Sequence, residues 1–552
     1  MTSTGSVAAP TPTPKSQHSA TGTRQSFIDR LTSPGGLFLS AVLLAAAFPL
    51  TAPIRDPDFW WHLRSGQLIL QSGGLLHTDP FTYTVSNHAW TMHEWLTEVL
   101  FAKLYSWGGL GAVVAVVSVV SWLGVVCIFA RARLDRPGPF ALGFGIVLAV
   151  IAGYPIWGPR AQMLTFAFAC LTLLLAERHL RRGGRLAWLL LPMFLVWGNL
   201  HSGFLIGLGF IAVIVAAEAI AHLLHIEGRA PAGRVRSLGL LLVGSLLVCA
   251  INLNGPSIIL YPFGTLGSVA QQSLILEWHS PDFHDWSVRI FGLMLLSLVG
   301  LIVANRSIRL RDAALVLVTV VLALQSVRHI ALFVAAATPV WISQTDILLA
   351  RRRRRPRRPQ KLPPAGMRVV SWLALCGALL AVYIGTRLVP AVQTHEDSLF
   401  YAQDFPVCAA RWLAADPLPL RVFNQYGEGG YLAYRLSAHG DRVYIFGDAA
   451  LMGDALLYAY GDVESVTPQW DSILHSAGTD VVLFDTNAPL SNVMVHASDW
   501  VEVYSDPHNT AFAPRDRVAA LQLPPQPAYT TPGDTCTKLV QTPASQLSQQ
   551  PG

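Results

Sequence analysis

Long apolar stretches separated by short polar connections occupy the chain as far as residue 390. A helix crosses a bilayer core with about 20 consecutive apolar residues, and stretches near that length recur throughout this part. The stretches lie at 37–52, 109–130, 139–156, 162–177, 186–200, 204–224, 237–251, 290–304, 312–327, 329–350 and 368–389. The pattern predicts about 11 membrane-spanning helices, several of them short for a single crossing.

The pattern of polar and apolar residues changes after residue 390. Strand-like runs begin at Arg421, Arg442 and Val481, and helical stretches lie near 404–414 and 448–460. Residues 391–523 are therefore predicted to form a small α/β domain that follows a transmembrane domain at 35–390. Residues 1–34 are rich in Ser, Thr, Pro and Gly and residues 524–552 in Pro, Gln and Thr, so we expect two disordered tails.

Composition and charge indicate how the chain lies in the lipid bilayer. It is 52% hydrophobic and 13% charged, with a mean hydropathy of +0.43, as expected of a multi-pass membrane protein. Basic clusters lie at 131–136, 178–185, 229–236, 306–311 and 351–361. Because basic loops stay in the cytoplasm, this bias predicts a cytoplasmic N-terminus and a C-terminal domain on the outer face of the plasma membrane. These loops also account for the net charge of +6, and no nucleic-acid partner is expected.

Residues suited to chemistry gather in the connections predicted to lie outside. The first outer loop, 53–108, begins with Asp56, Pro57 and Asp58, and a second long outer loop spans 252–289. The candidate substrate-binding residues of the outer connections are His62, His93, Arg160, His201, Glu277, His279, Arg328 and His329. Acids, histidines and arginines on one side of the membrane predict an outward-facing reaction site.

The first outer loop resembles that of the GT-C integral-membrane glycosyltransferases, within them the aminoarabinose and protein O-mannosyl transferase type. In that type a catalytic Asp opens an amphipathic helix that ends some fifteen residues later at Ser-Gly, and Asp58 and Ser72-Gly73 fit this spacing. The resemblance covers 35–390 in architecture and about 56–105 in motif. On the same helix, Phe59, Leu63 and Leu70 are predicted to share a face against lipid headgroups.

The resemblance implies a polyprenyl-phosphate-linked sugar donor and a glycan, lipid or protein acceptor. It implies Asp58 as the general base, with Asp56 as its neighbour or alternate. Where many relatives have a basic residue and Pro-Pro-Leu, this chain has His93-Glu94-Trp95-Leu96, so Glu94 is a candidate second acid. The segment 424–432 lacks the tryptophans and the acid of the oligosaccharyltransferase Trp-Trp-Asp-Tyr-Gly element, and peptide binding is not carried over.

The chemistry of these residues agrees with glycosyl transfer. A carboxylate such as Asp58 can accept the acceptor's proton, and Arg160, Arg328, His329 or His201 can hold the departing phosphate. Burial of the loop would raise the pKa of the base and a nearby arginine would lower it. Asp56 and Asp58 can also bind a divalent cation, Mg²⁺ or Mn²⁺, through oxygen ligands, with Glu277, His279, Asp282 or His284 as further ligands. A plainer interpretation makes Asp56 a helix cap or turn residue before Pro57.

Other functions remain open at this stage. A transporter or flippase of a lipid-linked substrate would also explain many spans, although its ionisable residues usually lie near mid-membrane. A lipid-linked glycan ligase or polymerase would use the long loop 252–289, and a noncatalytic assembly role would need none of these groups. Cys408 and Cys536 are the cysteines predicted outside, and they can pair in an oxidising compartment.

Overall fold

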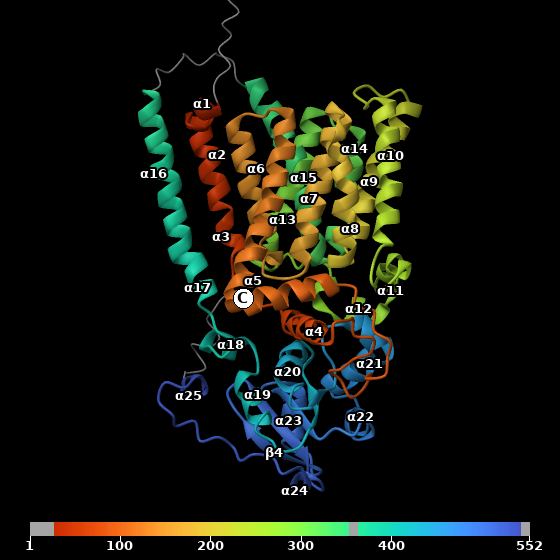
Figure 1. Cartoon of the computed structure of the whole chain (residues 1–552), viewed down its shortest axis with the longest axis vertical. Coiled ribbons are helices and arrows are strands. Elements are labelled where there is room, and N and C mark those ends of the chain that lie inside the picture. The colour runs from red at the N-terminus through yellow and green to blue at the C-terminus, as the bar shows by residue number, and fades with distance from the viewer. Residues whose placement is uncertain (1–26, 353–362, 542–552) are drawn as a thin grey trace, which may run out of the picture.

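The computed structural model describes residues 27–352 and 363–541. A helix bundle forms one end of the molecule and a mixed domain forms the other (Figure 1). The bundle contains α2 (Pro34–Ala45), α3 (Ala47–Leu50), α5 (Trp95–Ala132), α6 (Pro139–Ala152), α7 (Gln162–Arg182), α8 (Leu190–Leu200), α9 (Phe204–Leu223), α10 (Ala232–Cys249), α13 (Trp286–Asn305), α14 (Leu310–Gln325), α15 (Ile330–Arg352) and α16 (Ala365–Tyr383). We call the end that faces the C-terminal domain the domain side.

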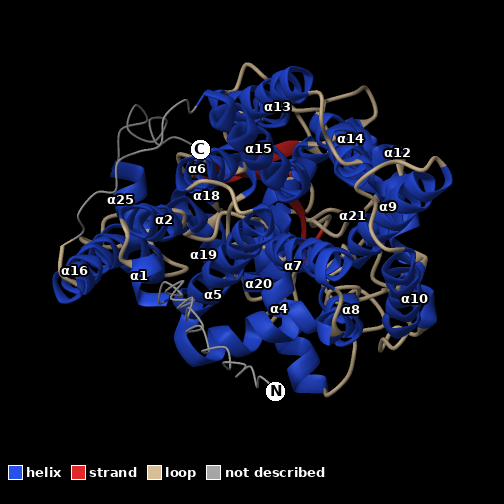
Figure 2. Ribbon diagram, turned by 90° about the horizontal axis from the view of Figure 1, so that it is seen from above, coloured by secondary structure: helices blue, strands red, loops and turns tan. Residues whose placement is uncertain are grey.

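Seven helices in the described part of the chain are long and apolar enough to cross a membrane. They are Trp95–Asp135, Gln162–Arg182, Phe204–Leu223, Ala232–Cys249, Trp286–Asn305, Val327–Arg351 and Ala365–Val392. Pro34–Leu50, Pro139–Ala152 and Arg185–Leu200 are apolar but shorter, so the total of about 11 spans stays a prediction. None of the residues in the most apolar stretch of Ala365–Val392 is buried inside the structure. Helix α16 stands at the edge of the bundle near α1 and α2 (Figure 2). This exposure suits a helix that faces lipid.

The first outer loop contains two helical segments at the domain side (Figure 1). Helix α4 (Asp58–Ser72) ends at Gly73, whose φ of 74° is left-handed, so the predicted end of the helix is confirmed. Helix α5 bends where Gly109 has a φ of 61°, and its first turns precede the apolar span. A Cβ on Gly66 would lie 2.0 Å from the Glu98 carbonyl oxygen, so only glycine permits this crossing of α4 and α5.

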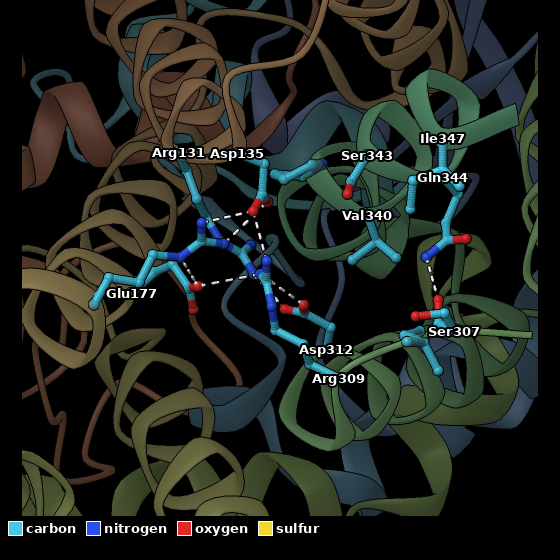
Figure 3. A pocket seen from close by; sticks show the side chains of 13 residues that line it. Arg131, Asp135, Glu177, Ser307, Arg309, Asp312, Val340, Ser343, Gln344 and Ile347 are labelled. Carbon is cyan, nitrogen blue, oxygen red and sulfur yellow. Dashed lines mark hydrogen bonds and ion pairs between the residues drawn. The ribbon is translucent and has the colours of Figure 1, made fainter. Parts of the chain in front are cut away.

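The opposite end of the bundle is closed by buried ion pairs (Figure 3). The Arg311 Nη2 lies 3.0 Å from Glu177 Oε1, and Arg311 also pairs with Glu218. Arg309 reaches Asp135 at 2.5 Å, and its side chain is 36% exposed where that of Arg311 is 5% exposed. Pairing of this kind lets charged side chains lie inside a membrane bundle, and here it joins α7, α9 and α14.

A five-stranded sheet with order β2-β1-β3-β5-β4 forms the centre of the C-terminal domain. The strands are β1 (Arg421–Asn424), β2 (Arg442–Val443), β3 (Val481–Asp485), β4 (Trp500–Ser505) and β5 (Asn509–Pro514). Its helices are α18 (Leu399–Asp404), α19 (Val407–Leu413), α20 (Gly429–Leu436), α21 (Ala449–Glu464), α22 (Trp470–Ser476), α23 (Pro489–Met494) and α24 (Val518–Leu521). Strand β1 pairs parallel with β2 and β3, whereas β5 pairs antiparallel with β3 and β4. The predicted α/β domain is confirmed, as are the strand-like runs at Arg421 and Val481. Of the run that begins at Arg442 only Arg442–Val443 is a strand, and β4 and β5 were not expected.

The domain packs onto α4 and the first outer loop. A Cβ on Gly430 in α20 would lie 2.5 Å from the Pro57 carbonyl oxygen. Trp60 of α4 is fully buried, with its ring centroid 5.0 Å from that of Tyr431 and 5.6 Å from that of Tyr401. The backbone N–H of Val443 in β2 donates to the Phe81 carbonyl at 3.0 Å. The loop is thus held between the bundle and the domain.

Three expectations from the sequence are wrong in detail. Phe59 and Leu63 are buried and only Leu70 is exposed, because α4 is enclosed between α5, whose Phe101 contacts Phe59, and the C-terminal domain, where lipid was expected. Residues 27–31 form helix α1 (Phe27–Leu31), while residues 1–26 lie outside the described part. Residues 524–541 carry α25 (Thr535–Gln541) and pack on the domain through the disulfide Cys408–Cys536, which confirms the predicted pairing. Residues 542–552 also lie outside the described part.

The remaining short helices connect these elements at the domain side. They are η2 (Tyr154–Ile156), η4 (Pro256–Ile259), α11 (Tyr261–Gly267), α12 (Val269–Leu274), η5 (Leu276–Trp278), η6 (Val327–His329), α17 (Val389–Val392) and η8 (Tyr426–Glu428). They bring residues of the outer connections close to the start of α4.

Candidate active site

Asp58 is the first residue of α4, at the junction of the bundle and the C-terminal domain. Its backbone N–H donates to Asp56 Oδ1 at 3.2 Å, so Asp56 caps the turn, as its plainer interpretation predicts. Its Oδ1 accepts a hydrogen bond from Trp61 Nε1 at 3.1 Å. A Cβ on Gly447 would lie 1.5 Å from Asp58 Oδ1, so the domain reaches the carboxylate at a position where only glycine fits.

The surroundings of Asp58 favour its protonated form. Burial raises the pKa of Asp58 to about 7, and the negative charges of Asp56 and Glu277 act in the same direction. The charge of His62 and the hydrogen bond from Trp61 act against this rise. Burial therefore outweighs the stabilising partners, and a carboxylate with a pKa near neutrality can both accept and release a proton at physiological pH.

Arg160 explains why no arginine offsets the burial of Asp58. Its Nε lies 3.2 Å from Asp56 Oδ2 and its Nη2 lies 2.7 Å from Glu277 Oε1. Burial alone would raise the pKa of Glu277, but Arg160 and Arg328 outweigh it and lower the pKa. Arg160 thus brings the first outer loop and the second outer loop together, with Asp56 as its partner rather than Asp58.

Arg328 lies at the same junction with a different environment. Its guanidinium carbon lies 4.6 Å from the ring centroid of Trp278, a cation–π contact. The Ser326 hydroxyl donates to the Glu277 carbonyl at 2.8 Å, which joins η6 to η5. Within the described residues Arg328 forms no ion pair within 4.0 Å, so its charge is available to an anion.

The other two candidates of this region lie away from Asp58. His279 is exposed, and its Nε2 contacts the Ser273 carbonyl at 3.0 Å. His329 Nδ1 contacts the Leu322 carbonyl at 3.3 Å, and its ring meets Trp278 edge-on. Both side chains are engaged with neighbouring backbone, and neither contacts the carboxylates of the first outer loop.

A second cluster surrounds Glu94, a buried residue with 6% exposure. Glu94 Oε1 lies 3.1 Å from His93 Nε2 and 3.3 Å from His201 Nε2, and Glu94 Oε2 lies 3.4 Å from His62 Nε2. Burial would raise the pKa of Glu94, but His201, His62 and His93 outweigh it and hold the pKa below the usual range. Glu94 is therefore a buried anion among three histidines, and its expected role as a second acid stays a prediction.

The histidines around Glu94 differ in charge. Burial lowers the pKa of His62, but Glu94, Glu98 and Asp58 outweigh it and raise the pKa to about 9. Burial lowers the pKa of His201 to about 4 despite the nearby Glu94. The Gly203 N–H donates to His201 Nδ1 at 2.8 Å, so neutral His201 carries its proton on Nε2 toward Glu94. His201 is thus unsuited to hold a phosphate.

Trp61 connects the two clusters. Its ring centroid lies 3.6 Å from that of His62, and its Nε1 donates to Asp58. His62 Nδ1 in turn lies 3.3 Å from Glu98 Oε1. A change in the charge of His62 therefore acts on the pKa of Asp58.

The divalent cation expected at Asp56 and Asp58 stays a prediction. Among residues 27–352 and 363–541, no group of three or more His, Cys, Asp or Glu side chains is arranged to hold a metal ion. Asp56 is engaged by Arg160, and Asp58 faces Trp61. Neither Glu277 nor His279 completes a set of oxygen or nitrogen ligands, so we derive no metal-dependent step.

Comparisons with known proteins bear on the fold. No protein-family profile and no curated protein matches the sequence. The structure is similar to the crystal structure of the Archaeoglobus fulgidus oligosaccharyltransferase tethered with an acceptor peptide containing the NVT sequon, with a TM-score of 0.51 and 12% identity over 87% of this chain and 73% of that chain. The chain shares the fold of this oligosaccharyltransferase.

Two further solved structures were matched with lower TM-scores. The archaeal oligosaccharyltransferase AglB from Archaeoglobus fulgidus, in complex with an inhibitory peptide and a dolichol-phosphate, has a TM-score of 0.49 and 9% identity over 87% of this chain and 74% of that chain. ArnT from Cupriavidus metallidurans, bound to undecaprenyl phosphate, has a TM-score of 0.46 and 16% identity over 88% of this chain and 98% of that chain. At such identities the likeness concerns the fold alone.

The C-terminal domain supplies Tyr426 and Gly447, which the sequence did not indicate, and Asp448, which the sequence had placed near a strand end facing the membrane cavity. The Tyr426 hydroxyl donates to the Gly447 carbonyl at 3.4 Å, and Trp90 Nε1 donates to Asp448 Oδ2 at 2.7 Å. The only local signal was the pair Gly447-Asp448 directly after a strand-like run. Gly447 becomes informative once its distance from Asp58 is known.

Proposed function

We propose that this protein is a membrane glycosyltransferase that moves a sugar from a polyprenyl-phosphate donor to an acceptor hydroxyl, with Asp58 as the general base. The carboxylate of Asp58, with a pKa of about 7 at the junction of bundle and domain, carries this proposal. In the step, the acceptor oxygen bonds to the anomeric carbon of the sugar, and the bond from that carbon to the phosphate oxygen breaks. The phosphate leaves with the electron pair, and the acceptor proton passes to Asp58.

The departing phosphate needs a positive group at the same edge of the bundle. Arg328 supplies a guanidinium that rests on Trp278 and lies near Glu277. Arg160 is already shared by Asp56 and Glu277, so we assign it a positioning role for the first outer loop. Arginine suits this task because its planar fork binds phosphate oxygens in pairs.

The orientation is part of the same proposal. Arg131 at the end of α5, Arg181 at the end of α7 and Arg309 just before α14 line one pocket (Figure 3), and these helix ends lie opposite to the C-terminal domain (Figure 1). The positive-inside rule then places the domain and Asp58 on the outer face of the plasma membrane. The disulfide Cys408–Cys536 agrees, because disulfides persist in oxidising compartments.

Turnover of purified protein in nanodiscs tests this function in an assay without any transport step. A panel of polyprenyl-phosphate sugars is offered to the wild type, Asp58→Asn, Asp56→Asn and the exposed control Asp282→Asn. We expect one donor to be consumed, with at least about 100-fold slower turnover in Asp58→Asn because a general base contributes about 10²–10⁴. Asp282→Asn should match the wild type, since this residue lies away from the site.

The same variant has an expected effect on stability. The folded-state pKa of Asp58 is raised from 3.8 to about 7, so folding loses free energy as the pH rises through this window. Asp58→Asn should therefore raise the apparent Tm more at pH 8 than at pH 4. Wild-type turnover in Asp58→Asn, or no donor turnover by folded wild type, would contradict the function and favour a transporter.

A further inference from the structure

A cavity lies between the C-terminal domain and the residues just before α4. Its volume is 300 Å³, and Pro57, the residue that precedes Asp58, lines it. The polar side chains of its wall include Arg55, Asp404, Glu428, Asp485, His508 and Asn509. This volume is at the lower end of small-molecule sites, which span about 300–1,000 Å³, so it suits one end of a ligand rather than an extended peptide.

Two polar atoms of this wall lack partners. Glu428 Oε2 and His508 Nε2 are withdrawn from solvent, and neither has a hydrogen-bond partner in the described part of the chain. The other oxygen of Glu428 accepts a hydrogen bond from Asn509 Nδ2 at 2.7 Å, which fixes the side chain. Buried polar groups without partners cost free energy, so these two atoms call for a ligand that can donate and accept hydrogen bonds.

The side chains of the wall favour a neutral ligand over an anionic one. Asp404, Glu428 and Asp485 bring carboxyl groups to the cavity, and the only guanidinium of the wall, on Arg55, lies 3.8 Å from Asp404. Burial raises the pKa of Glu428 to about 8, and Asp506 and Asp485 act in the same direction. A carboxyl group that keeps its proton near neutrality both donates and accepts, as a sugar hydroxyl requires.

We propose that this cavity binds the acceptor and that the acceptor ends in a neutral, hydroxyl-rich sugar. This assignment rests on the proposed function: Pro57 lines the cavity, and Asp58, which does not line it, follows Pro57 at the start of α4. An acceptor that ends in this cavity extends past Pro57 to bring a hydroxyl to Asp58, while the donor phosphate is kept near Arg328, outside this wall. The two substrates are thus separated by charge.

Binding to the full chain in nanodiscs, without donor, tests the assignment. The probes are an array of neutral oligosaccharides of glucose, galactose, mannose and N-acetylhexosamine, with uronic-acid oligosaccharides for comparison. We expect neutral probes alone to bind, with affinity lowered about tenfold in Glu428→Met, which keeps the side-chain length but removes its hydrogen bonds. Glu428→Gln should stay within about twofold, because an amide still donates and accepts.

Controls separate this assignment from folding and from catalysis. Glu502→Met alters an exposed residue of β4 and should bind like the wild type, and the apparent Tm of each variant reports folding. Lost turnover in Asp58→Asn concerns the catalytic proposal, whereas lost probe binding in Glu428→Met with wild-type binding in Glu502→Met concerns this assignment. Binding of uronic-acid probes alone, no binding of any neutral probe, or equal binding by folded Glu428→Met would overturn the assignment.

Discussion

Replacing Gly447 by alanine places a methyl group where the Asp58 carboxylate lies. An ideal Cβ at residue 447 would be 1.5 Å from Asp58 Oδ1 and 2.6 Å from Asp58 Cγ, whereas contacts under 3.0 Å essentially never occur for real Cβ atoms. The carboxylate or the segment around Gly447 must therefore move by roughly 1.5 Å. The hydrogen bond from Trp61 to Asp58 would be lost in such a shift.

The expected loss in rate follows from this displacement. A misplacement of about 1 Å at a reacting group can cost about 100-fold in rate. We therefore expect kcat of Gly447→Ala to fall by about two orders of magnitude. Loss of the Trp61 hydrogen bond should lower stability by only about 1 kcal/mol, so the variant should still fold.

Donor turnover in nanodiscs and the apparent Tm measure these two effects separately. Gly461→Ala in the same domain as Gly447 is the matched control. Its new Cβ would lie 3.7 Å from Leu274, an ordinary van der Waals distance. The double variant Asp58→Asn/Gly447→Ala should be no slower than Asp58→Asn, since both changes act through one carboxylate. Wild-type kcat in Gly447→Ala, or additive losses in the double variant, would refute the role of Asp58 and its contact with the domain.

The remaining predictions concern charge and covalent structure. Wild-type turnover should rise with pH around a midpoint near 7 as Asp58 loses its proton. In His62→Gln this midpoint should move upward, because the charge of His62 lowers the pKa of Asp58. An unchanged or lower midpoint in the pH–rate profile of the variant would contradict this. Arg311→Gln should destabilise the bundle by about 3–5 kcal/mol, because Glu177 and Glu218 lose a buried partner. Arg309→Gln should cost about 1 kcal/mol or less, because the Arg309 side chain is more exposed. Equal shifts in apparent Tm would contradict the difference in burial between the two arginines. Cys536→Ser should lower the free energy of unfolding by about 5 kcal/mol at most, and with it the apparent Tm, because the disulfide closes a separation of 128 residues. Replacing the free cysteine in Cys376→Ser should leave the apparent Tm unchanged. A reductant without effect on the apparent Tm of the wild type would argue against the pairing.

Features governed by neighbouring residues were predictable from the sequence. The apolar stretches identified the bundle helices, and Ser72-Gly73 identified the end of α4, because hydrophobic length and a left-handed glycine act locally. The strand-like runs of the C-terminal domain were also found, since buried strands are short and rich in Val and Phe. The location of 524–541 was missed because contacts with distant residues, such as Trp412 with Pro524 and Arg411 with Asp534, attach it together with the disulfide, whereas its local composition predicts disorder.

The site depended on contacts between distant segments. The sequence alone determined which groups stand near the start of α4, but it left open whether an arginine or burial sets the pKa of Asp58. Only the tertiary structure decided this, by pairing Arg160 with Asp56 across 104 positions and by bringing Gly447 against Asp58. The physical reason is that local patterns govern helices and caps, whereas burial and ion pairing depend on which loops the packed bundle and domain bring together.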